Sequence, residues 1–413
     1  MPDFETSKVI VNVTRPLSGR VDVPAGKSEI IRAVFCAALC EGESRINGVY
    51  LSDDVSAALR CAESLGAVWR NDGDSVLISG RVNPPEPVFD CGEAASVLRF
   101  AIPAAMALCG GGTFIGHGRL MARPLEPYFE LFDQWGTEYE LNENTLVVKG
   151  KFPSGSHRVS GSMSSQFVSG VLMALPLVGG GEVYAENGLN SSGYADMTCD
   201  VMRRAGACVS RTGDRFTVSG EYAPFVIDCV GDWSQAAFWY AANHLGADIT
   251  IGNLKNNSNQ PDEKIRELSS MMIKTGELCL DLSDNPDLLP PLALMASVRD
   301  GGCVFFGCER LKYKESNRLE SVVCTLKKLG ADIDPDGEKI LVRGKQKLCG
   351  GAADSFGDHR IAMMAAVAAI TCENPVEITG ADSVNKSYPD FFREFERLGG
   401  HGCVSISGNK TEN

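Results

Sequence analysis

Charged residues gather in the segment Arg310–Leu319, between an apolar run and a stretch with helical periodicity. Lys314 and Arg318 are four residues apart and Glu315 and Arg318 three apart, so in a helix they share one face. The periodicity continues over residues 319–329, which predicts that this charged group occupies the first turn of a helix. Cations at that end oppose the helix dipole, so they suit the binding of an anion better than helix stability.

Similar polar clusters precede other predicted helices. Serine and aspartate at such positions usually cap a helix, which explains Ser164, Ser165, Asp232 and Asp287 when each is taken alone. Capping does not explain the cations at the same positions, which are Lys27, Arg123, Lys314, Arg318, Arg360 and Lys386. Free N–H groups at a helix start, joined by Arg and Lys, form anion sites. A ligand that carries both phosphate and carboxylate groups would use all of them.

A self-similar unit recurs six times, roughly every 55 to 70 residues. Each copy has a Gly-rich turn, a short strand, an amphipathic helix and a hairpin, and the fourth copy, from Leu245, is the most degenerate. A second, Ala-rich helix lies between copies: Ile30–Leu39, Val97–Leu108, Phe167–Leu177, Ser234–His244, Leu288–Val298 and Ile361–Ile370. Strands that alternate with helices predict α/β or α+β layers.

Length and composition limit the classes of protein. A chain of 413 residues predicts two or three domains, and the net charge of −14 argues against a general nucleic-acid or membrane surface. Met1–Ser7 is polar and acidic, unlike a signal peptide, and no apolar run has transmembrane length. The fifteen cysteines contain no C-x-x-C, so we expect buried thiols in a reducing cytoplasm and no zinc site.

Seven motifs occur in one order along the chain. They are Gly26-Lys27-Ser28 with Arg32, Arg123-Pro124, Ser164-Ser165-Gln166, Pro286-Asp287, Lys314-Glu315-Ser-Asn-Arg318, Gly357-Asp-His-Arg360 and Asn385-Lys386-Ser-Tyr-Pro-Asp390. With this ordered set the chain resembles the 5-enolpyruvylshikimate-3-phosphate synthase family over essentially its whole length.

The resemblance implies a two-domain inside-out α/β barrel with six β-α-β-α-β-β repeats, three per domain, and helices inside. It assigns residues 20–229 to a domain on the shikimate 3-phosphate side, and residues 1–19 with 230–413 to a domain on the phosphoenolpyruvate and base side. It also implies transfer of the enolpyruvyl group of phosphoenolpyruvate to the 5-hydroxyl of shikimate 3-phosphate, through a tetrahedral intermediate. We expect no metal or organic cofactor, and a cytoplasmic monomer with small anionic substrates and no nucleic-acid or membrane partner.

Catalysis of this reaction needs acid–base groups among cations, because a carbon is protonated while a hydroxyl loses its proton. Asp287 is the predicted base, Glu315 and Lys386 are the candidate proton donors, and Lys27 bridges the two substrates. By resemblance, shikimate 3-phosphate is held by Lys27, Ser28, Arg32, Ser164, Ser165, Gln166, Ser191, Asp287 and Lys314. By resemblance, phosphoenolpyruvate is held by Lys27, Ala95, Arg123, Gln166, Arg318, Arg360 and Lys386.

Some positions depart from the family pattern. Glu93-Ala-Ala95-Ser96 replaces the usual Asn-Ala-Gly-Thr, so Ala95 stands for a glycine that lies against phosphoenolpyruvate. We expect its methyl group to crowd the larger analogue glyphosate and to confer tolerance. Ile30-Ile31, Arg310 and Ser192-Gly193 also differ from the usual residues, which affects the contacts expected with shikimate, above all at Ser191.

Two alternative functions are compatible with a similar fold. The UDP-N-acetylglucosamine enolpyruvyl transferases are similar, but they carry a cysteine five residues before the Arg-Pro motif, where this chain has Gly118. The second alternative is a non-catalytic anion- or nucleic-acid-binding protein built on the same repeat. The acidic pI of about 4.9 and the presence of Asp287, Glu315 and Lys386 argue against it.

Overall fold

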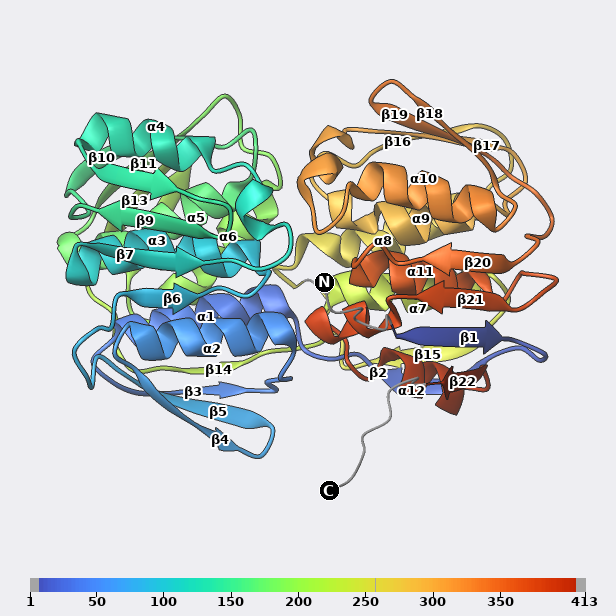
Figure 1. The fold of residues 1–413 in the computed structure, drawn as a ribbon, viewed down its shortest axis with the longest axis horizontal. Coiled ribbons are helices and arrows are strands. Elements are labelled where there is room, and N and C mark those ends of the chain that lie inside the picture. Colours follow the sequence, from blue (N-terminus) through green and yellow to red (C-terminus); the bar gives the residue numbers. More distant parts are fainter. Residues whose placement is uncertain (1–6, 257, 406–413) are drawn as a thin grey trace. The chain divides into compact units, whose positions relative to one another are not determined.

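The structure is a computed structural model and describes residues 7–256 and 258–405, so most of Met1–Ser7 lies outside the described residues. The chain divides into two compact units. Unit 1 comprises Met1–Val23, Gly231–Asn256 and Asp262–Asn413. Unit 2 comprises Pro24–Val230 and Asn257–Pro261. Each unit combines helices and sheets, as Figure 1 shows, so the predicted mixed α/β class is confirmed.

One repeat of unit 2 shows the basic module. Its elements are β6 (Val88–Asp90), α3 (Ala95–Cys109), β7 (Gly111–Ile115), α4 (Glu126–Trp135), β8 (Glu138–Leu141) and β9 (Thr145–Lys149). The sheet order is β6-β7-β9-β8, in which β6 and β7 are parallel and the other pairs antiparallel. A parallel pair needs a crossover connection, which α3 supplies, whereas β8 and β9 form a hairpin. The module is therefore the predicted β-α-β-α-β-β unit.

Two further repeats have the same sheet order. In unit 2 the elements are β10 (Gly155–Ser160), α5 (Ser165–Ala174), η2 (Leu175–Val178), β11 (Gly181–Glu186), α6 (Ser192–Arg204), β12 (Cys208–Thr212) and β13 (Arg215–Ser219). In unit 1 they are β16 (Leu278–Asp281), η4 (Pro286–Leu288), α9 (Leu289–Ala296), β17 (Gly302–Phe306), η5 (Glu309–Tyr313), α10 (Arg318–Lys328), β18 (Asp332–Asp336) and β19 (Lys339–Arg343). Both repeats pair their first two strands in parallel.

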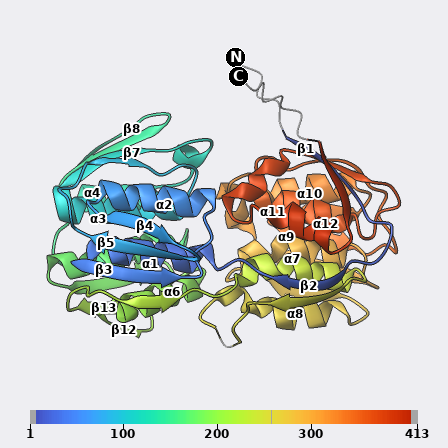
Figure 2. The ribbon, with the colours of Figure 1, turned by 90° about the horizontal axis from the view of Figure 1, so that it is seen from below.

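Two of the remaining repeats pair strands that are far apart in the sequence. In unit 2, β14 (Val226–Asp228) lies parallel to β3 (Gly42–Asn47), which is followed by β5 (Ser75–Gly80) and β4 (Val68–Asp72). The helices of that repeat are α1 (Lys27–Leu39) and α2 (Asp53–Ser64). In unit 1, β2 (Ser18–Asp22) lies parallel to β15 (Asp248–Gly252), and Figure 2 shows β2 running beside α7 (Trp233–His244). These long-range pairings involve the segments near which the chain passes from one unit to the other.

The N-terminal strand completes the last repeat. β1 (Lys8–Asn12) lies between β21 (Val376–Thr379) and β22 (His401–Ser405), antiparallel to both, and β20 (Gly351–Asp354) is the far edge. The other elements of this repeat are α11 (His359–Ala368), η6 (Ala381–Lys386) and α12 (Phe391–Arg397). The sheets of the described residues are six separate sheets, so the predicted barrel is not closed. The fourth repeat contributes only the two-stranded β15-β2 sheet, together with η3 (Pro261–Lys264) and α8 (Ile265–Met272), which agrees with its degenerate sequence.

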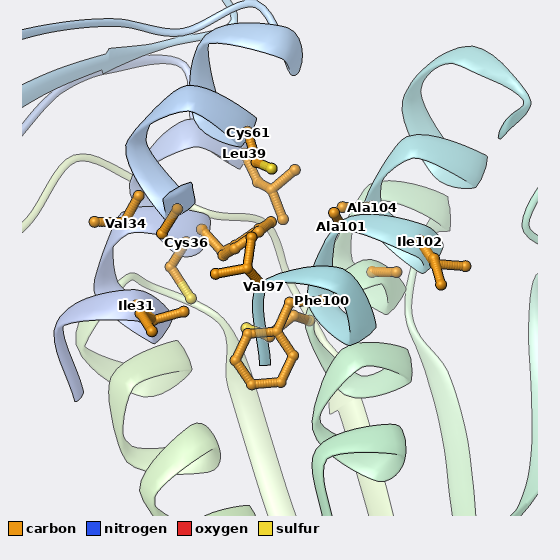
Figure 3. Packing of buried hydrophobic residues seen from close by; sticks show 14 of the residues in the cluster. Ile31, Val34, Cys36, Leu39, Cys61, Val97, Phe100, Ala101, Ile102 and Ala104 are labelled. Carbon is orange, nitrogen blue, oxygen red and sulfur yellow. The ribbon is translucent and has the colours of Figure 1, made fainter. Parts of the chain in front are cut away.

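The six Ala-rich helices form the interior of the units, as predicted. They are α1, α3, α5, α7, α9 and α11, and every residue of α9 and α11 is buried. A helix that is apolar on all sides can only be stable inside a core. Figure 3 shows this packing in unit 2, where Ile31 and Cys36 of α1 lie near Val97 and Phe100 of α3. Most of the described cysteines are buried free thiols.

One predicted boundary is wrong. The helix expected to include Lys314 and Glu315 in its first turn begins only at Arg318. The preceding residues form η5, and Lys314 has extended backbone angles (φ −85°, ψ −164°) that end it. Ser316 and Arg318 both contact Asp358, so a distant residue holds the segment before the helix in place.

Candidate active site

Unit 1 brings five of the predicted residues into one charged network. Arg318, at the first position of α10, donates from Nη1 to Asp287 (2.7 Å) and from Nη2 to Glu315 (2.5 Å). Asp287 lies in η4, where it also contacts Lys314 Nζ (3.1 Å) and Arg360 Nη2 (3.2 Å). Three cations therefore surround one carboxylate: Lys314 and Arg318 belong to the same repeat as Asp287, and Arg360 belongs to the next one.

Asp358 is the buried hub of this network. Its Oδ2 accepts from Arg318 Nε (2.8 Å), and its Oδ1 accepts from Arg318 Nη2 (3.0 Å) in a bidentate pair. The same carboxylate caps α11 through the backbone N–H of Arg360 (3.0 Å) and accepts from Ser316 Oγ (3.1 Å). A bidentate pair fixes the plane of the guanidinium, so Asp358 sets the direction in which Arg318 reaches Asp287.

Exposure rises across the network toward Asp287. The side chains of Asp358 and Arg318 are 0% and 1% exposed, whereas Asp287 keeps 17% and Lys314 24%. Arg360 is 4% exposed, and its Nη1 is buried without a hydrogen-bond partner among the described residues. Buried donors normally have a partner, so this one is suited to an acceptor from a ligand. Asp287 is the carboxylate of this network best placed to meet a substrate.

The ionisation of Asp287 follows from its neighbours. Burial alone would raise the pKa of Asp287, but Arg360, Lys314 and Arg318 outweigh it and hold the pKa well below its ordinary 3.8. Burial would likewise lower the pKa of Arg318, but the negative charges of Asp358, Glu315 and Asp287 raise it. Asp287 is therefore an ionised proton acceptor at neutral pH, and its contribution to stability is lost only as the pH falls below 3.8.

Lys386, the other candidate proton donor, lies at the end of η6. The residue is 6% exposed and is followed by the buried Ser387. Gln235, in the first turn of α7, donates from Nε2 to Ser387 Oγ (2.8 Å). The segment that carries Lys386 is thus tied to the N-terminus of a buried helix.

In unit 2, Lys27 begins α1 and forms an ion pair with Asp54 of α2 (2.8 Å). The two side chains are 16% and 7% exposed, so the pair is mostly buried. Asp54 was missed in the sequence, where Asp53-Asp54 after Ser52 has the pattern of an ordinary capped helix start.

Arg32 lies one turn inside α1, and neutral groups hold it. Its Nε donates to Thr198 Oγ1 (2.7 Å), Nη1 to the Ser28 carbonyl (2.7 Å) and Nη2 to the Tyr194 carbonyl (3.1 Å). Burial lowers the pKa of Arg32 to about 10, so it stays a cation at neutral pH. Arg32 fixes the start of α6 against α1, whereas its predicted contact with shikimate 3-phosphate remains a prediction.

Arg99 of α3 organises two of the predicted positions in unit 2. Its Nη1 donates to Gln166 Oε1 (2.8 Å) and its Nη2 to the carbonyl of Pro124 (3.0 Å), the residue after Arg123. The guanidinium also lies over the ring of Phe167, 4.4 Å from its centroid. A lone arginine in the apolar run Val97–Leu108 was the available sequence signal, because a buried charge needs specific partners.

The remaining predicted residues of unit 2 lie at helix starts. Ser164 caps α5 by accepting from Gln166 N (3.3 Å), and Ser165 is buried as the first residue of that helix. Ser191 precedes α6 with a left-handed backbone (φ 55°) and is buried. Ala95 is the first residue of α3 and is 6% exposed, so little of it is accessible to solvent.

These features define a class of protein. Two α/β units that place cations at the starts of buried helices, with one ionised carboxylate among arginines, define an enzyme that acts on anionic substrates. Within the part of the chain that the structure describes, no helix is both long and apolar enough to cross a membrane. Among residues 7–256 and 258–405, no group of three or more His, Cys, Asp and Glu side chains is placed to hold a metal ion.

Comparison with known proteins identifies the family. The model of the family "EPSP synthase (3-phosphoshikimate 1-carboxyvinyltransferase)" matches residues 11–395. The 3-phosphoshikimate 1-carboxyvinyltransferase of Clostridium kluyveri is 37% identical, covering 95% of this chain and 97% of that protein. The Clostridioides difficile protein of the same name is 36% identical, over 93% and 96%. This chain belongs to the EPSP synthase family and is a transferase.

The fold agrees with this assignment. A solved structure of EPSP synthase from Acinetobacter baumannii matches with a TM-score of 0.79, covering 96% of this chain and all of that chain, at 21% sequence identity. The predicted two-domain fold with repeated β/α units is confirmed by this match.

Proposed function

We propose that this protein transfers the enolpyruvyl group of phosphoenolpyruvate to the 5-hydroxyl of shikimate 3-phosphate and releases phosphate. The observation that carries the proposal is the geometry at Asp287, an accessible ionised carboxylate held by Lys314, Arg318 and Arg360. The reaction needs a base for a hydroxyl, and it needs cations for the phosphate that leaves. Both requirements meet at this one residue of unit 1.

Asp287 acts as the base and anchors the shikimate ring. Because the pKa of Asp287 lies well below its ordinary value, the carboxylate is ionised before the substrate arrives and can accept a hydrogen bond from the 5-hydroxyl. When phosphoenolpyruvate binds to Arg318 and Arg360, their positive charge is shared with its phosphate and carboxylate. The carboxylate of Asp287 then becomes the stronger base that the transition state requires.

The proton for the methylene carbon comes from Lys386 rather than Glu315. Glu315 accepts a hydrogen bond from Arg318 Nη2 at 2.5 Å, a contact typical of an ionised carboxylate, which has no proton to give. Lys386 is a buried ammonium group at the end of η6, and an ammonium group carries a proton that it can donate. Glu315 then orients Arg318, while Lys386 also holds phosphoenolpyruvate.

Within unit 2, the helix starts hold the second anion. Lys27, Ser28, Arg32, Ser164, Ser165, Gln166 and Ser191 bind shikimate 3-phosphate, and Lys27, Ala95, Arg123 and Gln166 contact phosphoenolpyruvate. The support is that Arg32 and Arg99 are fixed by hydrogen bonds to neutral acceptors, which orient both guanidinium groups. We assign unit 2, predicted as residues 20–229, to the shikimate 3-phosphate side, and unit 1, predicted as residues 1–19 with 230–413, to the phosphoenolpyruvate and base side.

The alternative sugar-nucleotide transferase fits this chain less well. At the position of its cysteine, Gly118 has a φ of +55°, and a Cβ there would lie 2.6 Å from Glu93 Oε1. A backbone in this left-handed region suits glycine, and a cysteine side chain would have to displace Glu93. The reaction also needs no metal or organic cofactor, and we place the enzyme in the cytoplasm as a monomer.

The decisive experiment measures phosphate release from phosphoenolpyruvate with two acceptors in separate assays, shikimate 3-phosphate and UDP-N-acetylglucosamine. We expect release with shikimate 3-phosphate alone, unchanged by EDTA, and its loss in Asp287→Ala. The matched control is Asp284→Asn, which changes an exposed carboxylate three residues earlier and retains activity. Release only with the sugar nucleotide would assign the chain to the other transferase, and release with neither would leave a binding protein. Size-exclusion chromatography with light scattering tests the monomer.

A further inference from the structure

The first turn of α7 contacts two separate segments of unit 1. The cap residue Asp232 accepts at Oδ1 from Ser234 N (2.8 Å) and Ser234 Oγ (2.6 Å), and Ser234 Oγ accepts from Arg360 Nη2 (3.1 Å). The next residue, Gln235, donates to Ser387 Oγ. Two adjacent side chains therefore link Arg360 in α11 with the end of η6.

The hydrogen bond between Gln235 and Ser387 is buried, and it uses only the nitrogen of the Gln235 amide. Gln235 is 1% exposed and Ser387 5% exposed, while Gln235 Oε1 has no hydrogen-bond partner among the described residues. A buried amide with one unmet acceptor costs stability, which an apolar side chain of the same length would not. The amide at this position therefore has a use other than stability.

The role of the Gln235 amide follows from the residue that precedes Ser387 in the sequence. Lys386 precedes it, and a lysine ammonium group on a four-carbon chain is placed well only if its backbone is fixed. The same face of α7 holds the following residues, because Trp239 packs against Phe391 with ring centroids 5.3 Å apart. Gln235 and Trp239 are one helical turn apart, so together they hold residues 387–391 against α7.

We propose that Gln235 is a positioning residue that fixes Lys386 through Ser387. The adjacent Ser234 connects the same helix start to Arg360. The inference rests on the proposed function, because it matters only if Lys386 takes part in the transfer. Gln235 itself touches no reacting atom. Its loss should lower kcat and raise the KM for phosphoenolpyruvate, while the KM for shikimate 3-phosphate stays within about twofold.

The test is a double-mutant cycle with Gln235→Met and Ser387→Ala. Each single variant should lower kcat/KM for phosphoenolpyruvate by about tenfold, and the double variant should show the same loss of about tenfold. Ser297→Ala is the matched control, because Ser297 is a fully buried serine of unit 1 that donates to the Ala293 carbonyl, away from this link. It should keep full kcat/KM even where its Tm falls.

The outcomes separate the inference from the proposed function. If Lys386→Ala retains full activity, the role proposed for Lys386 is wrong. If Lys386→Ala loses activity while Gln235→Met and Ser387→Ala do not, or if their losses multiply to about a hundredfold, the positioning role is wrong. Should Gln235→Met fail to fold, Ser387→Ala decides alone, since it removes one oxygen atom. An unchanged kcat/KM in that variant overturns the proposal.

Discussion

The buried arginines predicted for the site are held by opposite means in the two units. In unit 1, Arg318 and Arg360 contact carboxylates, and the carboxylates raise the pKa of both guanidinium groups. In unit 2, Arg32 contacts one hydroxyl and two backbone carbonyls, and burial lowers its pKa to about 10. The same kind of side chain therefore donates its hydrogen bonds to carboxylates in one unit and to neutral groups in the other.

This difference assigns different work to the two units. Arginines without counter-ions attract and hold an anion strongly, because a phosphate supplies the charge that the protein withholds. Arginines that already pair with carboxylates bind an anion less strongly, but an arriving anion changes the proton affinity of the carboxylate beside them. Under the proposed function, unit 2 holds the charged substrate and unit 1 moves the proton.

The difference in charge pairing between the two units can be tested most directly at Asp358. Asp358→Asn removes one charge of a fully buried pair and leaves Arg318 short of a counter-ion, so we expect a loss of about 3–5 kcal/mol in the free energy of unfolding. The same change at Asp54 of unit 2 affects a pair with more exposure, and we expect a loss of about 1 kcal/mol. Urea unfolding of both variants measures the difference. Equal losses would contradict the idea that the units use their charges differently.

Arg32→Lys tests the opposite case in unit 2. A lysine keeps the positive charge but lacks the planar guanidinium group, so it cannot donate to Thr198, Ser28 and Tyr194 at the same time. We expect a loss of about 2 kcal/mol in the free energy of unfolding and a KM for shikimate 3-phosphate raised about tenfold. Arg45→Lys is the control, because Arg45 is 38% exposed in the same unit and should change stability by less than about 0.5 kcal/mol. An unchanged KM in Arg32→Lys would make Arg32 purely structural.

Local pattern predicted the repeats, the buried helices and most of the charged residues, because these follow from periodicity and from cations at helix starts. It placed Lys314 and Glu315 inside a helix that begins later, because Asp358, forty residues beyond Arg318, holds the preceding segment in place. Periodicity within one helix contains no information about that contact.

Other features depend on partners that are distant in sequence. The pairing of β14 with β3 in unit 2 and that of β2 with β15 in unit 1 each join segments roughly 200 residues apart, which no local signal specifies. Asp54 and Gln235 have sequences typical of ordinary helix starts, and only their contacts with Lys27 and Ser387 distinguish them. Arg99 differs, since a charge within an apolar helix is visible in the sequence.

Ala95→Gly tests the effect of a single methyl group in unit 2 on the binding of a substrate analogue. Ala95 begins α3 and is almost fully buried, so a ligand larger than the substrate should meet its methyl group. Relief of such crowding is worth about 1–3 kcal/mol, and we expect glyphosate to inhibit the variant at least about tenfold more strongly, with little change in the KM for phosphoenolpyruvate. Ala94→Gly, which alters the preceding cap residue, should leave inhibition unchanged. Inhibition of the wild type at low micromolar glyphosate would contradict the prediction.

The smallest expected effect concerns pH and a residue of unit 2 outside the site. His157 of β10 is 3% exposed between the rings of Trp135 and Phe152, and burial lowers its pKa from the ordinary 6.5. The unfolded chain therefore binds this proton at a higher pH than the folded chain does. Stability is complete above pH 6.5 and is lost as the pH falls toward the folded pKa, by at most about 1.4 kcal/mol per pH unit.

His157→Phe keeps an aromatic ring between Trp135 and Phe152 and removes the proton, so the variant should lose about 1 kcal/mol less than the wild type between pH 7 and pH 5. His244→Gln is the counterpart in unit 1, where burial and the charge of Arg299 lower the histidine pKa in the same direction. Asp287 cannot contribute in this range, because its depressed pKa confines its effect to pH values below 3.8. Urea unfolding at the two pH values separates these contributions. A wild type equally stable at both would show that His157 accepts its proton without unfolding, as a solvated histidine would.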